Sequence, residues 1–335
     1  MTVSIGVIGT GNIGSYHIDR LSTGISGARV GAVFDVATER ARVIAERVGA
    51  TVHASAQDVV TDPSVDAVLI ASPGELHAEQ VLACLEAGKP VLCEKPLAPT
   101  TGECLKVVEA EASGGRRLVQ LGFMRRFDPA YRDVKSLLDS GAIGTALMLH
   151  CQHRNPTVPD TFTSDMSLTD SVVHEVDTAR WLLDDEIVAV TVLAGRPSPR
   201  APGMQDPQLV LFEMASGVLV DVESFVTAQY GYDVRCELVG SDGVAAMDTP
   251  ALGTRAQSGG RTVRVPADWK ERFGAAYHNE LQDWVNSLAT GRFHGADAWD
   301  GYAATAVAEA GLRARAERRR VAVELVDRPA FYRRG

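Results

Sequence analysis

The stretch Val3-Ser4-Ile5-Gly6-Val7-Ile8-Gly9-Thr10-Gly11-Asn12-Ile13-Gly14 decides the fold. An apolar run predicts a strand over Ser4–Ile8, and the glycines that follow form a G-x-G-x-x-G pattern at the start of a predicted helix. Gly9 permits a tight turn, Gly11 lets the backbone approach a pyrophosphate, and Gly14 lets the helix pack on the strand. The pattern predicts a dinucleotide-binding unit; the alternative is a glycine-rich turn without a ligand.

An acidic residue in the right place strengthens this interpretation. Asp35 follows the next predicted strand, Arg29–Phe34, 21 residues after Gly14. A carboxylate there accepts hydrogen bonds from ribose hydroxyls and repels a 2′-phosphate, which favours NAD over NADP. Val36 follows at a position where NADP sites often carry Arg or Ser, but Arg40, a helical turn further on, leaves an NADP option open.

The rest of the chain shows two different patterns of predicted strands and helices. Up to about residue 121, short apolar runs alternate with helical patterns, which is typical of βαβ units and a parallel sheet. From 187 to 247, consecutive strand-like runs predict an antiparallel or mixed sheet. We therefore expect an α/β chain with a dinucleotide-binding domain at 1–123 and an α+β domain at 124–335. Predicted strands are Ser4–Ile8, Arg29–Phe34, Ala67–Ala71, Pro90–Cys93, Arg117–Leu121, Thr145–His153, Val188–Leu193, Gln208–Met214, Val218–Val226 and Asp233–Val239.

Composition excludes several classes of protein. The chain has 335 residues and a formal net charge of −10, which argues against a nucleic-acid partner. No apolar run reaches about 18 residues and no basic segment precedes the first strand, so neither a membrane span nor a signal peptide is expected. The five cysteines (84, 93, 104, 151 and 236) are scattered without a CxxC pair, which favours reduced thiols in a cytoplasm and no structural zinc.

Two further segments carry candidate catalytic groups. Glu94-Lys95-Pro96 follows a predicted strand, and the carboxyl ends of strands in an open α/β sheet face the ligand. Lys95 is equally compatible with an ordinary surface lysine. Asp170 and His174 stand four residues apart on a predicted helix over 168–183, and hence on one face.

Three interpretations of the Asp170–His174 pair remain open. Asp170 caps the helix beside a core histidine, the two side chains bind a metal, or Asp170 orients His174 as a general base. A metal site lacks an obvious third ligand, so we expect none. A dinucleotide-dependent oxidation requires a base for the hydroxyl proton, which favours the third interpretation.

The three motifs, in this order and spacing, resemble the glucose–fructose oxidoreductase/inositol dehydrogenase (Gfo/Idh/MocA) family over essentially the whole chain. The resemblance implies a Rossmann domain followed by a domain with a large, open-faced, mostly antiparallel sheet that serves as an oligomer interface, with a homotetramer expected. Narrower segments are similar to the family members that act on inositol, which implies NAD-dependent oxidation of myo-inositol to its 2-keto product. These segments are 120–128, 153–156, 230–233 and 272–281.

Specific roles follow from the resemblance. It implies that Lys95, Asp170 and His174 form a catalytic triad. The cofactor-binding residues it implies are Gly9, Gly11, Asn12, Ile13, Gly14, Asp35, Ser72, Pro73, His77, Glu94 and Lys95. The polyol-binding residues it implies are Met124, Arg125, His153, Asn155, Asp170, Ser171, His174 and Tyr232, with Tyr230 a competitor of Tyr232. Glu175 stands where the family usually has Asp.

Two other functions remain open. The same triad would serve scyllo-inositol, D-chiro-inositol or an aldose such as glucose. A non-catalytic NAD-binding regulator is a more distant alternative, because it predicts a broken triad and all three residues are present.

Overall fold

The computed structural model describes residues 2–247 and 254–333, and within them the chain forms two compact units. The first contains 2–124, 277–305 and 325–333, and the second contains the described part of 125–276 together with 306–324. The first unit thus includes two segments beyond the boundary expected at 123. The reason is packing, because Leu281, Trp284 and Val285 belong to the core of the first unit.

The first unit is built on a six-stranded sheet in the order β3-β2-β1-β4-β5-β6. Every strand pair in it is parallel, as the alternating sequence pattern predicts. The order reverses between β1 and β4, and a reversal of this kind opens a crevice at the carboxyl ends of the strands. The strands are β1 (Val3–Ile8), β2 (Ala28–Phe34), β3 (Thr51–Val52), β4 (Ala67–Ile70), β5 (Val91–Cys93) and β6 (Val119–Leu121).

Helices cover both faces of this sheet because its strands are apolar on both sides. Ile5 and Val7 of β1 join a core that includes Ile18 and Trp284, whereas a side chain at Gly6, between them, would collide with Val59 on the other face. The helices of the unit are α1 (Asn12–Thr23), α2 (Thr38–Val48), α3 (Ala56–Thr61), α4 (His77–Glu86) and α5 (Thr101–Gly114), joined by parts of α8 (Trp269–Thr290) and α9 (Ala298–Glu317).

The second unit contains a seven-stranded sheet in the order β12-β11-β7-β10-β9-β8-β15. Only the central pair of this sheet, β7 and β10, is parallel among the described strands. This mixed, mostly antiparallel sheet confirms the predicted fold class. Its strands are β7 (Ala146–Arg154), β8 (Ile187–Ala194), β9 (Gln208–Met214), β10 (Leu219–Phe225), β11 (Asp233–Gly240), β12 (Val244–Ala246) and β15 (Val321–Ala322), while β13 (Thr254–Gln257) and β14 (Gly260–Val263) form a separate hairpin.

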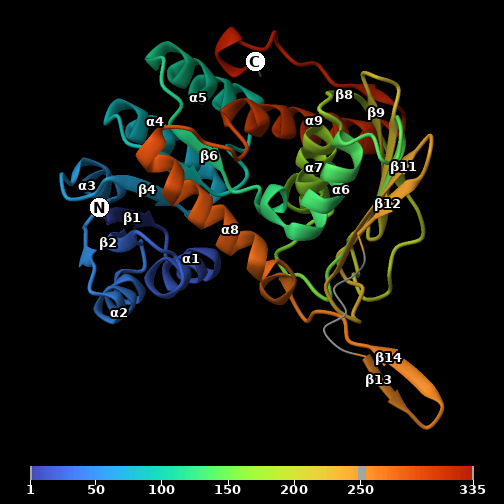
Figure 1. Ribbon diagram of the computed structural model, residues 1–335, viewed down its shortest axis with the longest axis horizontal. Coiled ribbons are helices and arrows are strands. Elements are labelled where there is room, and N and C mark those ends of the chain that lie inside the picture. Colours follow the sequence, from blue (N-terminus) through green and yellow to red (C-terminus); the bar gives the residue numbers. More distant parts are fainter. Residues whose placement is uncertain (1, 248–253, 334–335) are drawn as a thin grey trace. The chain divides into compact units, whose positions relative to one another are not determined.

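One face of this sheet is covered by helices and the other carries exposed apolar side chains. Figure 1 shows α6 (Pro129–Asp139) and α7 (Val173–Leu183) on the same side of the sheet. On the opposite face, Leu193 and Leu209 are partners across β8 and β9 and are both exposed. Leu211 and Leu219 are exposed on the same face.

The predicted helix over 168–183 is not a single α-helix. Ser167–Val172 forms a π-helical turn, and α7 begins only at Val173. Asp170 lies in the π-helical turn and His174 in α7, so the α-helical spacing that predicts a shared face does not apply to this pair. Within the described residues, no helix is long and apolar enough to cross a membrane.

Candidate active site

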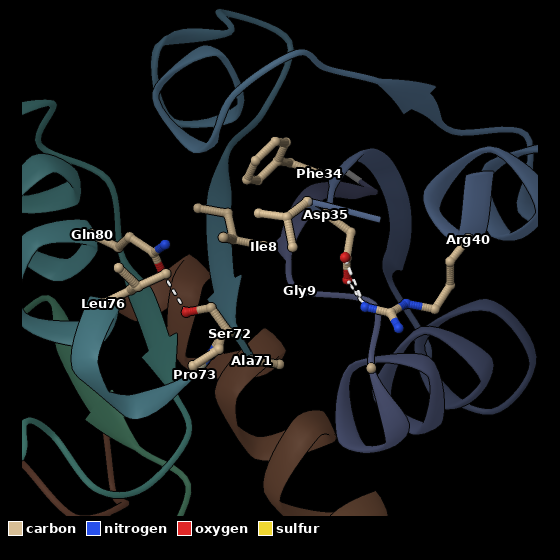
Figure 2. A pocket seen from close by; sticks show the side chains of 12 residues that line it. Ile8, Gly9, Phe34, Asp35, Arg40, Ala71, Ser72, Pro73, Leu76 and Gln80 are labelled. Carbon is tan, nitrogen blue, oxygen red and sulfur yellow. Dashed lines mark hydrogen bonds and ion pairs between the residues drawn. The ribbon is translucent and has the colours of Figure 1, made fainter. Parts of the chain in front are cut away.

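A cavity of about 250 Å³ lies at the carboxyl ends of β1, β2 and β4 in the first unit, where the strand order reverses. Figure 2 shows Ser72, Leu76 and Gln80 on one side of it, Asp35 and Arg40 on the other, and Ile8 and Gly9 between them. A volume of this size accommodates part of a dinucleotide. The lining residues are Ile8, Gly9, Gly11, Phe34, Asp35, Val36, Arg40, Ala71, Ser72, Pro73, Leu76 and Gln80.

The three glycines of the first motif occupy three different environments. Gly9 has a φ of +94°, which L side chains rarely adopt, and a Cβ there would also collide with the backbone at Ala71. A Cβ at Gly14 would collide with the carbonyl oxygen of Gly9. A Cβ at Gly11, by contrast, would meet nothing within 4 Å. Gly9 and Gly14 are thus required by the fold, and Gly11 leaves open space at the start of α1, which fits a pyrophosphate on that helix end.

Asp35 is buried at the end of β2 and is held by several donors. Its Oδ2 accepts hydrogen bonds from the backbone N–H of Thr10 at 2.6 Å and from Thr10 Oγ1 at 2.9 Å. Its Oδ1 accepts one from the N–H of Ala37 at 2.8 Å. Arg40 Nη2 lies 2.7 and 2.8 Å from the two carboxylate oxygens. Burial alone would raise the pKa of Asp35, but the hydrogen bonds from Arg40, Thr10 and Ala37 lower it to about 2.

Some of the predicted cofactor-binding residues line this cavity and the others lie outside its lining. Gly9, Gly11, Asp35, Ser72 and Pro73 line it, whereas Asn12, Ile13, Gly14, His77, Glu94 and Lys95 do not. The ring of His77 is buried, with Nδ1 2.7 Å from the carbonyl oxygen of Pro96 and Nε2 2.9 Å from that of Ser72. This histidine therefore joins the loops that follow β4 and β5.

The Glu94-Lys95-Pro96 segment follows β5 and is fixed through its glutamate. Glu94 Oε1 lies 2.7 Å from Nε2 of the buried His17 on α1, and Glu94 Oε2 accepts from the backbone N–H of Lys95 at 3.3 Å. A Cβ at Gly122 would press against the same carboxylate. Glu94 thus positions the backbone that carries Lys95, and Lys95 itself is half-buried.

A cluster of buried polar side chains lies in the second unit, from β7, the π-helical turn and α7. The ring of His153 lies 6.3 Å from that of His174 and 6.2 Å from that of Tyr232, between ring centroids. Asp170 and Ser171 lie in the π-helical turn directly before His174. Turns of this kind are rare and occur frequently at functional sites.

Glu175 holds this cluster together through contacts with Arg125 and His153. It is fully buried, pairs with Arg125, and lies 3.0 Å through Oε2 from His153 Nδ1. Burial alone would raise the pKa of Glu175, but the charge of Arg125 and the contact with His153 hold it below its ordinary value. In the tautomer with its hydrogen on Nδ1, His153 donates a hydrogen bond to the ionised Glu175, and Nε2 is then the ring's acceptor for another group.

The structure separates the two tyrosine candidates. Tyr232 is buried beside His153 and Phe273, and burial raises its pKa to about 12, so its hydroxyl stays protonated. Tyr230 is 49% exposed and contacts Arg154 and Asp233 instead. Asn155 follows β7, and its Oδ1 is buried without a hydrogen-bond partner among the described residues. An unsatisfied acceptor of this kind suits a ligand hydroxyl.

Several residues of the first cavity were not predicted. Leu76 and Gln80 come from the segment after β4, and Gln80 accepts a hydrogen bond from Ser72 Oγ at 2.7 Å. Their position directly after a central parallel strand was the available signal. Met124 is buried in the first unit, and the other predicted polyol-binding residues belong to the second. Among the described residues, no group of three or more His, Cys, Asp or Glu is placed to hold a metal ion.

Comparison with known proteins gives matches over both units. Residues 3–123 match the model of the oxidoreductase family with an NAD-binding Rossmann fold, and residues 131–246 match the GFO/IDH/MocA C-terminal domain. Inositol 2-dehydrogenase 3 of Saccharopolyspora erythraea is 52% identical over 333 residues, which is 99% of this chain and 98% of that protein.

Solved structures are similar as well. Myo-inositol dehydrogenase from Lactobacillus casei, in complex with NAD(H) and myo-inositol, has a TM-score of 0.96 and 35% identity, with 99% of this chain and 100% of that chain covered. Scyllo-inositol dehydrogenase from the same organism has a TM-score of 0.89 and 27% identity, with coverages of 96% and 99%. The family models and the full-length similarity show that this chain belongs to the Gfo/Idh/MocA oxidoreductase family.

Proposed function

We propose that the protein is an NAD-dependent dehydrogenase that oxidises myo-inositol to 2-keto-myo-inositol. The assignment of the cofactor is supported by the cavity at the strand reversal, where Gly11 leaves open space and Asp35 follows β2. The substrate is supported by the 52% identity to an inositol 2-dehydrogenase and by the likeness to a chain solved with NAD(H) and myo-inositol.

The residues present fit the cofactor. Asp35 carries a full negative charge for the ribose hydroxyls, and the start of α1 offers backbone N–H groups to phosphate. Ser72 and Pro73 would contact the ligand from the end of β4. When bound, NAD⁺ accepts a hydride at its nicotinamide ring.

His174 is the proposed base for the substrate hydroxyl. A neutral imidazole takes the hydroxyl proton, and Asp170 holds the ring orientation and stabilises the cation that forms. Lys95 donates a hydrogen bond to the reacting oxygen and stabilises its developing negative charge. The proposal thus assigns the proton transfer to His174 and the stabilisation of negative charge to Lys95. It also predicts that oxidation becomes faster as pH rises from acid to neutral, because only the neutral imidazole accepts the proton.

The buried polar cluster of the second unit supports a polyol. Inositol carries a hydroxyl on every ring carbon, and each hydroxyl both donates and accepts. Arg125 and Tyr232 supply donors, while Asn155 Oδ1 and His153 Nε2 supply acceptors. A site of this kind rejects a ring that lacks one hydroxyl, because a buried partner then remains unpaired.

Scyllo-inositol is the second candidate, favoured by the 27% identity and TM-score of 0.89 to a scyllo-inositol dehydrogenase. It differs from myo-inositol only in the orientation of one hydroxyl. NADH formation with purified protein and NAD⁺ separates the candidates when myo-inositol, scyllo-inositol, D-chiro-inositol and glucose are compared. Preference for myo-inositol supports the proposal, and turnover of another ring alone contradicts its substrate.

A matched pair of histidine variants tests the base. His174→Asn should lower kcat by at least about a thousandfold while binding of NAD⁺ stays unchanged. His150→Asn is the control, because His150 is a partly exposed residue of β7 paired with Asp221. Equal losses in the two variants would contradict the role of His174.

The exposed sheet face supports a homotetramer. Leu193, Leu209, Leu211 and Leu219 form an apolar patch that a second copy of the chain would bury. Light scattering should give the tetramer mass for the native chain and a smaller species for Leu209→Glu combined with Leu211→Glu. Leu137→Glu, on exposed α6, is the control. A monomeric native chain would contradict this assembly.

The five cysteines are all buried and unbridged, which supports a reducing, cytoplasmic location.

A further inference from the structure

The acceptor sites of the Asp35 carboxylate are already occupied by hydrogen-bond donors of the protein, so no site is left for a ribose hydroxyl. Two oxygens offer about four acceptor sites, and Thr10, Ala37 and Arg40 already direct five donor contacts at them. A ribose hydroxyl that reaches Asp35 must therefore displace one of these donors. Figure 2 shows the ion pair between Asp35 and Arg40 at the wall of the cavity.

Arg40 is the donor that leaves at the lowest cost. The contacts from Thr10 and Ala37 include backbone N–H groups of the turns that follow β1 and β2, so their loss would disturb the loops themselves. The side chain of Arg40 is 49% exposed, so water can solvate its guanidinium when the ion pair opens, and a bound ribose hydroxyl then takes its place on Asp35. When Arg40 swings off Asp35, its guanidinium loses one acidic partner and regains water.

Arg40 remains beside the ribose after it leaves Asp35. It lines the same cavity, and its Nε already lies 3.4 Å from Thr10 Oγ1. The 2′-hydroxyl of a ribose held by Asp35 is thus within the range of this side chain. A guanidinium is the side chain best suited to a phosphate, because its N–H groups pair with two phosphate oxygens at once. Val36, the neighbouring residue of the wall, is 83% exposed and carries no charge that would repel or bind a phosphate.

We propose that Arg40 is a specificity-determining residue that admits a second class of ligand to this cavity, adenine dinucleotides with a 2′-phosphate. This inference rests on the proposed function of the cavity as a dinucleotide site. With a ribose hydroxyl, Asp35 is the acceptor and Arg40 turns outward. With a 2′-phosphate, Arg40 pairs with the phosphate and offsets the charge of Asp35. Asp35 still opposes the added negative charge, so NAD is bound more tightly and NADP is the weaker, accepted cofactor.

Binding of two adenosine fragments to the full chain tests this without any turnover. Adenosine 5′-monophosphate carries the 2′-hydroxyl, and adenosine 2′,5′-bisphosphate carries the 2′-phosphate. By calorimetry, the native chain should bind both. Arg40→Ala should weaken the bisphosphate by at least about tenfold and change the monophosphate by less than about threefold. Arg42→Ala is the matched control, because Arg42 lies on the same helix and pairs with Glu39 and Glu46 outside the cavity.

The outcomes are distinct. Selective loss of bisphosphate binding in Arg40→Ala, with Arg42→Ala unchanged, supports the inference. No bisphosphate binding to the native chain, or equal losses in both variants, overturns it, and oxidation of inositol with NAD⁺ in the same preparation then leaves the proposed function intact. Failure of both fragments to bind the native chain would overturn the inference together with the dinucleotide site.

Discussion

The Nδ1 atom of His153 lies 3.0 Å from Oε2 of Glu175, and both side chains are buried in the second unit. Because a buried carboxylate requires donors, this contact favours the histidine tautomer with its hydrogen on Nδ1, an atom that also lies 3.2 Å from Arg125 Nη2. Arg125 completes the charge balance by pairing with the same carboxylate. This carboxylate–histidine pair lies beside His174, with the two imidazole rings 6.3 Å apart between centroids.

Glu175→Gln should destabilise the protein because it leaves Arg125 buried without its counter-charge. Breaking a buried ion pair costs about 3–5 kcal/mol, and urea denaturation measures the loss. Glu223→Gln is the control, since Glu223 pairs with Arg154 at a more exposed site and should cost less than about 1 kcal/mol. Equal costs for both variants would contradict the central position of Glu175.

The pH dependence of this contribution has a definite sign. The pKa of Glu175 is lowered in the folded chain, so the folded state binds this proton less readily than the unfolded state does. Its stabilisation is fully present above the ordinary value of 4.5 and is lost as pH falls from there through the lower pKa of the folded chain. Denaturation of the native chain and of Glu175→Gln at pH 7 and pH 4 should therefore show a smaller difference at the lower pH. A larger difference there would refute the assignment.

Gly11 and Gly14 should respond differently to the same added methyl group. A Cβ at Gly14 meets the carbonyl oxygen of Gly9, so Gly14→Ala should lower the melting temperature markedly. A Cβ at Gly11 meets no protein atom within 4 Å, so Gly11→Ala should melt like the native chain and yet bind NAD⁺ more weakly by about tenfold or more. Calorimetry and thermal unfolding together check the pair. Normal NAD⁺ affinity in Gly11→Ala would place the pyrophosphate elsewhere.

Binding of NAD⁺ should hardly change between pH 5 and pH 9. The pKa of Asp35 is about 2 in the folded chain, so this carboxylate stays ionised throughout that range. NAD⁺ titrations at several pH values measure the affinity, with Asp35→Asn as the variant that should bind more weakly at every pH. A steep loss of affinity toward pH 5 in the native chain, absent from Asp35→Asn, would show that Asp35 titrates much higher.

Lys95→Gln should lower kcat by about a hundredfold or more, because stabilisation of a developing oxyanion is lost. The NAD⁺ dissociation constant should change little, since Lys95 does not line the cavity of the first unit. Lys106→Gln, on the exposed side of α5, is the control. Stopped-flow measurement of the first turnover separates the chemical step from product release. An unchanged rate in Lys95→Gln would show that Lys95 does not stabilise the reacting oxygen.

The sequence predicted the first sheet well because its signals are local. The apolar run of β4, the glycines at 9, 11 and 14, and Asp35 are each readable without knowledge of distant contacts. The π-helical turn was not predicted, because its residues have the same apolar spacing as an α-helix. Non-helical backbone at Phe273 interrupts helix α8, and no residue pattern in the sequence marks this position. The partners of Glu94 and Glu175 were also missed, since His17 and Arg125 lie 77 and 50 residues away from them along the chain.

The first unit is built from three stretches of chain, so it can be completed only late in synthesis. Its core requires Leu281 and Trp284, and the hydroxyl of Tyr332 hydrogen-bonds to the buried Glu111 beside β6. A ribosome makes residues 2–124 long before it makes these partners. The core of the first unit therefore emerges without the side chains that Leu281 and Trp284 supply, and it stays incomplete through the translation of the second unit. Segments 277–305 and 325–333 close it last, and a fragment ending near residue 123 would lack them.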